Sequence, residues 1–221
     1  LKQKIAIVSR RPQTTRHRIL GILNGDAYQI IFQDTPGMIQ PKYELQKFMV
    51  QTAQKSIAEA DLILMMIDAK HSEAEDEIVL KPLRSTHKPV CLIINKVDAV
   101  AKATLLPVID QYKDIPEFKE IIPVSALTGE GTDDLLKVIL KYLPAGFPFY
   151  PPEMISNEPE RFFVSEFIRE QIFLQFGEEI PYPTTVQVED FNERPGKKDY
   201  ILAAIVVERD SQKGILIGKG G

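Results

Sequence analysis

The sequence predicts an α/β domain with a mostly parallel sheet, followed by a small α+β domain. Two apolar runs, residues 62–68 and 89–94, lead into polar residues and are typical of strands buried on both faces. Residues 42–60 have apolar side chains at helical spacing, which indicates a crossover helix packed on the sheet. The proline-rich residues 144–159 then separate this pattern from a helix and two strands.

The remaining elements follow from periodicity and from turn residues. The first domain gains strands at 27–33 and 121–124 and helices at 72–85, 104–112 and 133–143. Ser72 and Glu75 can cap the first of these helices, and Pro107 begins or breaks the second. The second domain is predicted to contain a helix at 162–176 and strands at 184–191 and 200–208. We therefore place the first domain at residues 1–145, a linker at 146–160 and the second domain at 161–221.

Composition narrows the class of protein. The chain has 221 residues, is 44% hydrophobic and carries a net charge of -4, so its whole surface does not suit non-specific binding of polyanions. The sequence contains neither a run of about 18 apolar residues nor an opening signal peptide. Cys91 lies in an apolar run and is expected to be a packed core thiol. The first residues resemble the interior of a longer chain.

The stretch Asn95-Lys96-Val97-Asp98 places an amide, an ammonium and a carboxylate after a buried strand. Open α/β folds bind ligands at this edge of the sheet. The Asp98 carboxylate can accept two hydrogen bonds from the ring N–H and the exocyclic amine of guanine, a pair that adenine lacks. The alternative is an ordinary polar turn with an aspartate near a helix start.

A second candidate site lies in Asp34-Thr35-Pro36-Gly37, after the strand at 27–33. The Asp34 carboxylate can hold Mg²⁺ through water, and the backbone N–H of Gly37 can approach a terminal phosphate. Thr15, in the preceding loop, can place its hydroxyl on the same ion. That loop contains Arg10, Arg11, Arg16 and Arg18, which form either a phosphate-contacting surface or a solvated charged loop.

Two further motifs depend on their place in the chain. Ser125-Ala126-Leu127 follows a predicted strand. The Ala126 N–H can donate to the guanine oxygen, while Ser125 braces Asp98. Near the C-terminal end stand Gly218, Lys219, Gly220 and Gly221, a Gly-x-x-Gly turn that allows close approach of a nucleic-acid backbone. Its alternative is a glycine-rich tail or helix C-cap.

Taken together, these motifs resemble the Era family of GTPases. The resemblance rests on QTTRHR (residues 13–18), DTPG (34–37), NKVD (95–98), SAL (125–127), PERFFVSE (159–166) and GKGG (218–221). It covers essentially the whole chain and implies a Ras-like P-loop NTPase domain followed by an incomplete type II KH domain. The implied ligands are GTP, GDP and Mg²⁺. Thr15 and Gly37 are the implied catalytic residues, and Asn95, Lys96, Asp98, Ser125, Ala126, Leu127 and Asp34 the implied nucleotide-binding residues.

The resemblance also implies a biological role. It predicts a switch that binds the 3′ region of small-subunit ribosomal RNA and assists assembly of the small ribosomal subunit. The expected location is the bacterial cytoplasm, or the stroma or matrix of an organelle of bacterial descent. The expected form is a monomer, with peripheral membrane association as an additional expectation. Two rival functions are a nucleotide-independent RNA-binding scaffold with a decayed GTPase domain, and a GTPase that acts on another RNA or on a membrane surface.

The chain departs from the family pattern in two ways. A P-loop, GxxxxGK[ST], is expected before residue 1, and without one this chain alone should bind GTP poorly and hydrolyse almost none. The KH domain is expected to continue beyond Gly221. In addition, Met38 stands where fast Ras-like enzymes have a glutamine that orients the attacking water. Slow hydrolysis and another means of positioning the water are therefore expected.

Overall fold

A computed structural model of the chain describes residues 3–9, 11–70, 76–177 and 180–218. It contains two compact units: Gly37–Phe149 forms one, and Leu1–Pro36 with Tyr150–Gly221 forms the other. In those described ranges, no helix combines the length and the apolar content needed to cross a membrane.

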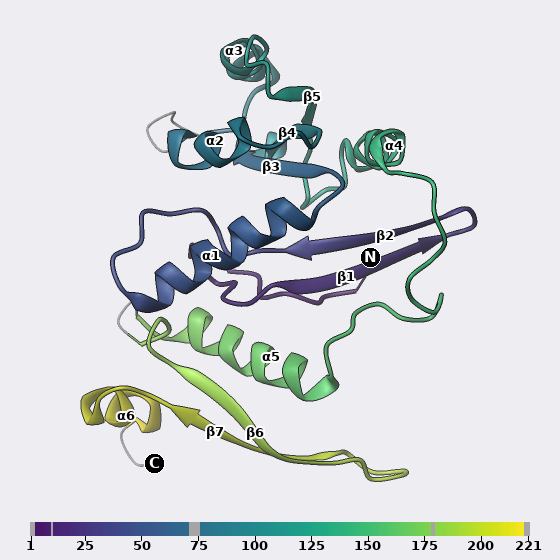
Figure 1. Cartoon of the computed structure of the whole chain (residues 1–221). Helices are drawn as coiled ribbons and strands as arrows, with labels where there is room; N and C mark the ends of the chain where they lie inside the picture. The colour runs from purple at the N-terminus through teal and green to yellow at the C-terminus, as the bar shows by residue number, and fades with distance from the viewer. Residues whose placement is uncertain (1–2, 10, 71–75, 178–179, 219–221) are drawn as a thin grey trace. The chain divides into compact units, whose positions relative to one another are not determined.

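The unit formed by Gly37–Phe149 contains a parallel sheet of three strands (Figure 1). Its strands are β3 (Ile63–Asp68), β4 (Val90–Asn95) and β5 (Phe118–Pro123), with β4 in the centre. Asp68 pairs in register with Asn95, so the polar ends of β3 and β4 meet at one edge of the sheet. This arrangement confirms the parallel strands predicted from the two apolar runs.

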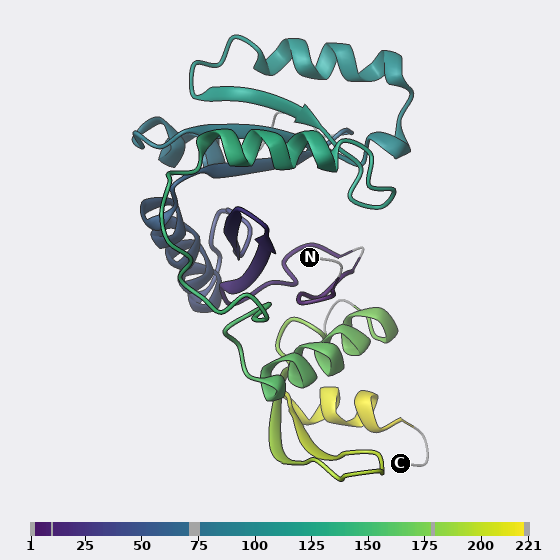
Figure 2. The same cartoon turned by 90° about the vertical axis from the view of Figure 1, so that its right-hand side faces the viewer.

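Helices cover both faces of this sheet (Figure 2). Alternate residues of β4 supply two separate cores. The helices of this unit are α1 (Glu44–Glu59), α2 (Asp76–Arg84), α3 (Lys102–Tyr112) and α4 (Thr132–Tyr142). Val90, Leu92 and Ile94 pack with residues of α2 and α3 on one face, whereas Cys91 and Ile93 pack with residues of α4 on the other.

Two details of the predicted elements need correction. Pro107 neither begins nor breaks α3, which starts at Lys102 and runs through it. Leu105 and Ile109 pack against the core on either side of Pro107, and this packing outweighs the missing backbone donor. Strand β5 begins at Phe118, three residues before the predicted start. The proposed capping residues Ser72 and Glu75 lie outside the described residues.

In the other unit, an antiparallel hairpin joins β1 (Ile19–Gly25) to β2 (Tyr28–Asp34). The sequence predicted β2 but not β1. Ile19 and Ile22 project from opposite faces of β1 and are both buried, so this strand is covered on both faces. The hairpin ends at Asp34 and therefore fixes the start of the predicted magnesium-binding stretch.

The linker between α4 and α5 (Glu160–Gln175) contains no regular element, as its proline content predicts. Between Tyr150 and Ile155 the linker is hydrogen-bonded to the β1–β2 hairpin. Ile22 donates its N–H to the Ile155 carbonyl at 2.8 Å, and Asn24 donates its side-chain amide to the Pro152 carbonyl at 2.8 Å. The linker is thus held in place from Tyr150 to Ile155.

The C-terminal elements form the predicted helix–strand–strand pattern. Helix α5 is followed by the antiparallel pair β6 (Thr185–Asn192) and β7 (Tyr200–Val206), and then by α6 (Asp210–Ile217). Ile172, Ile180 and Val186 form their buried core. Helix α6 ends at the first glycine of the predicted Gly-x-x-Gly turn.

Candidate functional site

The carboxyl end of β4 forms the centre of the predicted base-reading loop. Lys96 has a left-handed backbone with φ of 64°, and Val97–Ala99 makes one turn of 3-10 helix. This reversal leaves Asp98 exposed, while the buried Val97 anchors the turn. The Val97 N–H donates to the Val124 carbonyl at 3.2 Å, and the Val124 N–H donates to the Ile94 carbonyl at 2.8 Å. The loops after β4 and β5 are therefore joined at their bases.

Ser125 braces Asp98, as the sequence predicted. Its hydroxyl donates to Asp98 Oδ1 at 2.5 Å and accepts from the Thr128 N–H at 3.1 Å. Ser125 is fully buried, so its hydroxyl has one well-defined position. A carboxylate held in this way is preorganised to accept paired N–H donors from a ligand.

Asn95 also links the loop after β4 to the loop after β5. Its Oδ1 accepts the Lys96 N–H at 2.7 Å and the Ala126 N–H at 3.0 Å. The Ala126 N–H, predicted to donate to guanine, thus donates to Asn95 in this structure. No residue pattern had indicated this bond. The side chain of Leu127, the last residue of the motif, is 85% exposed and so is accessible to a ligand.

Asp68 is a member of the site that sequence reasoning missed. Its Oδ2 lies 2.8 Å from Lys96 Nζ. Burial by itself raises the pKa of Asp68, but hydrogen bonds from Lys96 and from the Lys70 N–H, with both positive charges, lower it below its usual value. The available signal was the position of Asp68 at the end of an apolar strand, beside the strand that ends at Asn95.

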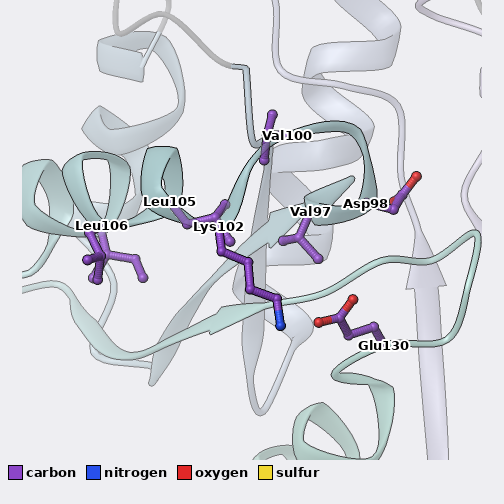
Figure 3. Close-up of a pocket in the computed structure, with 8 residues that line it drawn as sticks. Val97, Asp98, Val100, Lys102, Leu105, Leu106 and Glu130 are labelled. Carbon is purple, nitrogen blue, oxygen red and sulfur yellow. The ribbon is translucent and has the colours of Figure 1, made fainter.

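A cavity of about 480 Å³ lies beside this loop (Figure 3). Its apolar wall consists of Val97, Val100, Leu105, Leu106 and Ile109. Lys102 and Glu130 project toward the same space. Asp98 lines the cavity as well, but its carboxylate points away from the other residues in Figure 3. We therefore expect base recognition on the opposite side of the Asp98 turn.

Thr15 and Asp34 form the predicted magnesium-binding pair. The Thr15 hydroxyl donates to Asp34 Oδ2 at 3.3 Å. Although Asp34 is solvent-accessible, the protein atoms packed around its carboxyl raise its pKa above the usual value, and the bond from Thr15 partly offsets this rise. A carboxylate that is short of positive charge beside a hydroxyl oxygen suits a hard divalent cation.

The donor set around Thr15 and Asp34 fits a nucleotide-bound Mg²⁺. In the described part of the chain, no three His, Cys, Asp or Glu side chains cluster as a metal site. Mg²⁺ in nucleotide sites needs only one or two protein oxygens, because phosphates and water complete its coordination. Gly37, three residues after Asp34, is exposed, and a Cβ placed on it would meet no atom within 4 Å. Its N–H therefore lies in an open stretch of backbone.

The arginine-rich loop does not form the proposed phosphate-contacting surface at Arg16. This guanidinium donates to the backbone carbonyls of Thr184, Pro181 and Tyr182 at 2.9, 3.0 and 2.7 Å. Its donors are directed into the protein and serve to hold the loop. Arg10 lies outside the described residues.

The predicted RNA-binding turn begins where α6 ends. Gly218 has φ of 75°, a left-handed conformation that favours glycine, and its N–H donates to the Gly214 carbonyl at 3.1 Å. Lys219, Gly220 and Gly221 lie outside the described residues. The helix and two strands predicted before the turn are present in that order, and α6, which was not predicted, lies between them and the turn.

Comparisons with known proteins agree with this architecture. A family described as "50S ribosome-binding GTPase" matches residues 1–96, and a KH domain family matches residues 179–221. GTPase Era of Geotalea uraniireducens is 47% identical over 222 aligned positions, which include 100% of this chain and 75% of that protein. GTPase Era of Lactobacillus helveticus is 43% identical, over 99% of this chain and 73% of that protein.

Solved structures of Era share the same fold. The crystal structure of a single-substitution variant of Aquifex aeolicus Era bound to GDP.AlF4- superimposes with a TM-score of 0.94 at 40% identity, over 100% of this chain and 76% of that one. An Era structure in complex with MgGDPNP and nucleotides 1506-1542 of 16S ribosomal RNA gives a TM-score of 0.93 at 39% identity, over 99% of this chain and 76% of that one. The chain therefore belongs to the Era family of GTPases.

Proposed function

We propose that the protein is a GTP-driven switch that binds the 3′ region of small-subunit ribosomal RNA and assists assembly of the small ribosomal subunit. The observation that carries the proposal is the braced Asp98 carboxylate, which Ser125 holds in a loop tied to Asn95. A scaffold with a decayed GTPase domain has no need of this network. The network therefore favours a guanine-binding protein over the scaffold.

Each predicted group has a defined part in nucleotide binding. Asp98 reads the two N–H donors of guanine, while Asn95 and Ser125 hold the loops that present it. Thr15 and Asp34 would hold Mg²⁺, which when bound neutralises charge on the phosphates. Gly37 offers its backbone N–H to the terminal phosphate. When that phosphate leaves, the segments around Thr15 and Gly37 lose their shared ligand.

Hydrolysis is proposed to be slow without assistance. Met38 follows Gly37 and has no group that can orient a water molecule. A backbone group, a monovalent cation or the ribosome would then supply the missing orientation. The GTP-bound state would then last until the partner is correctly engaged, so the protein would time this step.

The RNA part of the proposal rests on the C-terminal elements. The match to a KH domain family includes the turn that starts at Gly218, and the Era relative described above was crystallised with a 16S ribosomal RNA fragment. We propose that this turn admits the RNA backbone and that Lys219 supplies positive charge. Because ribosomal subunits assemble in the cytoplasm of bacteria, we place the protein there. The monomeric state and peripheral membrane association stay predictions.

The exchange Asp98→Asn tests base recognition directly. An asparagine amide donates where the carboxylate accepts, so it suits the second carbonyl of xanthine and not the exocyclic amine of guanine. In the full-length protein, the affinity for GTP should fall by a factor on the order of 100 or more, and the affinity for XTP should rise. Titration calorimetry with GTP and with XTP measures both changes in affinity.

Asp110→Asn is the matched control. Asp110 is an exposed aspartate on α3 that pairs with Lys113, the residue that follows the helix. The same chemical change there should leave the affinities for GTP and XTP as in wild type. Unaltered GTP affinity in Asp98→Asn would contradict the assignment of the base-reading site.

A further inference from the structure

The segment that carries Thr15 is fastened on both sides of that residue to the C-terminal part of its own compact unit. Arg169 of α5 donates from Nη2 to the Thr14 carbonyl at 2.6 Å. Arg16 donates to the carbonyls of the segment from Pro181 to Thr184. Thr15 stands between these two anchored residues. Its hydroxyl position therefore depends on elements that follow the linker.

The Arg169 anchor is itself rigid. Arg169 is 3% exposed, and its Nε and Nη2 donate to the two oxygens of Glu166 at 2.9 and 2.7 Å. Such a buried, bidentate pair fixes the plane of the guanidinium. The Arg169 Nη2 atom donates both to Glu166 and to the Thr14 carbonyl, so this carbonyl of the loop is held at a fixed position beside α5.

Further bonds extend the contact along the loop. Glu170, the neighbour of Arg169 in α5, accepts the Val8 N–H at 2.7 Å and pairs with Lys4 Nζ at 2.5 Å. The hydroxyl of Tyr182 donates to the Pro12 carbonyl at 3.2 Å. The loop is thus hydrogen-bonded on both sides of Thr15 and also well before it. Because these bonds already restrict the loop, nucleotide binding costs less conformational entropy than it would with a free loop.

We infer that Arg169 and Arg16 are positioning residues of the GTPase site, which hold Thr15 where its hydroxyl can bind the Mg²⁺ of GTP. The inference rests on the proposed function, because it takes Thr15 as a magnesium ligand. GDP lacks the terminal phosphate that gathers this loop around the metal. The two arginines therefore favour GTP over GDP without touching either nucleotide.

Conservative substitutions test the inference. Arg169→Lys and Arg16→Lys keep the positive charge but cannot form the planar fork that reaches several acceptors at once. With saturating Mg²⁺, the affinity of the full-length protein for the β,γ-imido analogue of GTP should fall about tenfold in each variant, because a charge-assisted hydrogen bond to the loop backbone is lost. The affinity for GDP should stay within about twofold of wild type.

A double-mutant cycle separates positioning from a general structural role. In a Thr15→Ala background the hydroxyl is gone, so Arg169→Lys should cause no further loss of preference for the GTP analogue. Arg161→Lys is the matched control, because Arg161 is an exposed arginine on the same helix α5. Its preference should equal that of wild type. If Arg169→Lys fails to fold, as shown by its thermal unfolding, the cycle is made with Arg16→Lys.

Three results would overturn the inference. The first is an equal loss of affinity for the GTP analogue and GDP, which indicates general damage to the site. The second is a full effect of Arg169→Lys or Arg16→Lys in the Thr15→Ala background. The third is wild-type preference in both arginine variants. Failure of the proposed function looks different: wild-type protein would then bind the GTP analogue with no dependence on Mg²⁺.

Discussion

At the predicted base-reading loop, a buried polar residue supports an exposed one. Asp98 is exposed and able to meet a ligand, whereas Ser125, which holds it, is fully buried. A buried hydroxyl must keep its hydrogen bonds, and here one bond joins Ser125 to the loop after β4 and the other lies within its own loop after β5. This division of roles explains how a short polar loop can keep one conformation without covering its ligand-binding side.

Cys91 provides a single-residue test of the core behind the site. Burial, followed by the nearby negative charge of Glu120, raises the pKa of the Cys91 thiol to about 11. Because the thiolate is the reactive form, the reactive fraction at pH 8 should be on the order of 100-fold lower than in an unfolded chain. Reactivity should increase only as the pH rises toward that pKa.

Iodoacetamide labelling followed by mass spectrometry checks this expectation. At pH 8, native protein should label far more slowly than protein unfolded in urea. Since Cys91 is the single cysteine of the chain, one modification reports it without ambiguity. Equal labelling rates in the two states would show that β4 is not packed as described.

Sequence reasoning proposed the residues of the site but foresaw few of the contacts between them. Asn95, Asp98 and Ser125 were proposed because their motifs occur in order after apolar strands, and the bond between Ser125 and Asp98 is present as predicted. The ion pair of Lys96 with Asp68 was missed. It joins the ends of two adjacent strands, and strand adjacency becomes apparent only when the parallel sheet is assembled.

Among the secondary-structure elements, strands and helices were predicted well where the apolar run was continuous. The runs at 62–68 and 89–94 correspond to β3 and β4. Strand β4 is buried as predicted, whereas β3 is only partly buried, with Met66 57% exposed. The strand β1 was overlooked because Gly21 interrupts its apolar pattern and charged residues precede it. In the structure Gly21 lies opposite Phe32 in the hairpin, so tertiary pairing overrides its low strand propensity.

The turn between β5 and α4 offers a prediction about how two elements are joined. Gly131 has φ of 76°, and a Cβ there would lie 2.3 Å from the Pro123 carbonyl oxygen. Gly129 has a similar φ of 85°, but the nearest atom to its Cβ would be 4.0 Å away. Gly129→Ala should cost about 1–2 kcal/mol of stability from the left-handed backbone alone. Gly131→Ala should cost more, because backbone atoms must also move.

Urea unfolding of the two variants measures the difference. Gly131→Ala should also weaken GTP binding, since the displaced turn carries Ser125 and Ala126 into new positions. Gly129→Ala serves as its control for the backbone strain. Equal unfolding free energies in the two variants would contradict the close approach of the turn to β5.

In the molecule as a whole, one compact unit combines the two ends of the chain. Residues Leu1–Pro36 belong with Tyr150–Gly221, so the loop with Thr15 and the elements before the Gly-x-x-Gly turn share one unit. Arg16 and Arg169 supply bonds across that distance in sequence. The sequence could not reveal these bonds, because backbone carbonyls accept them and no residue pattern marks such acceptors.

The sharpest test of the proposed switch is to measure RNA affinity in two nucleotide states. Full-length protein is titrated with an RNA of the 3′-terminal 16S ribosomal sequence, with Mg²⁺ and either the β,γ-imido GTP analogue or GDP. A switch requires the two dissociation constants to differ, by about tenfold for a typical coupling. Lys219→Asp should weaken RNA binding in both states and leave nucleotide affinity unchanged. Identical RNA affinity with the GTP analogue and with GDP would contradict a GTP-driven switch.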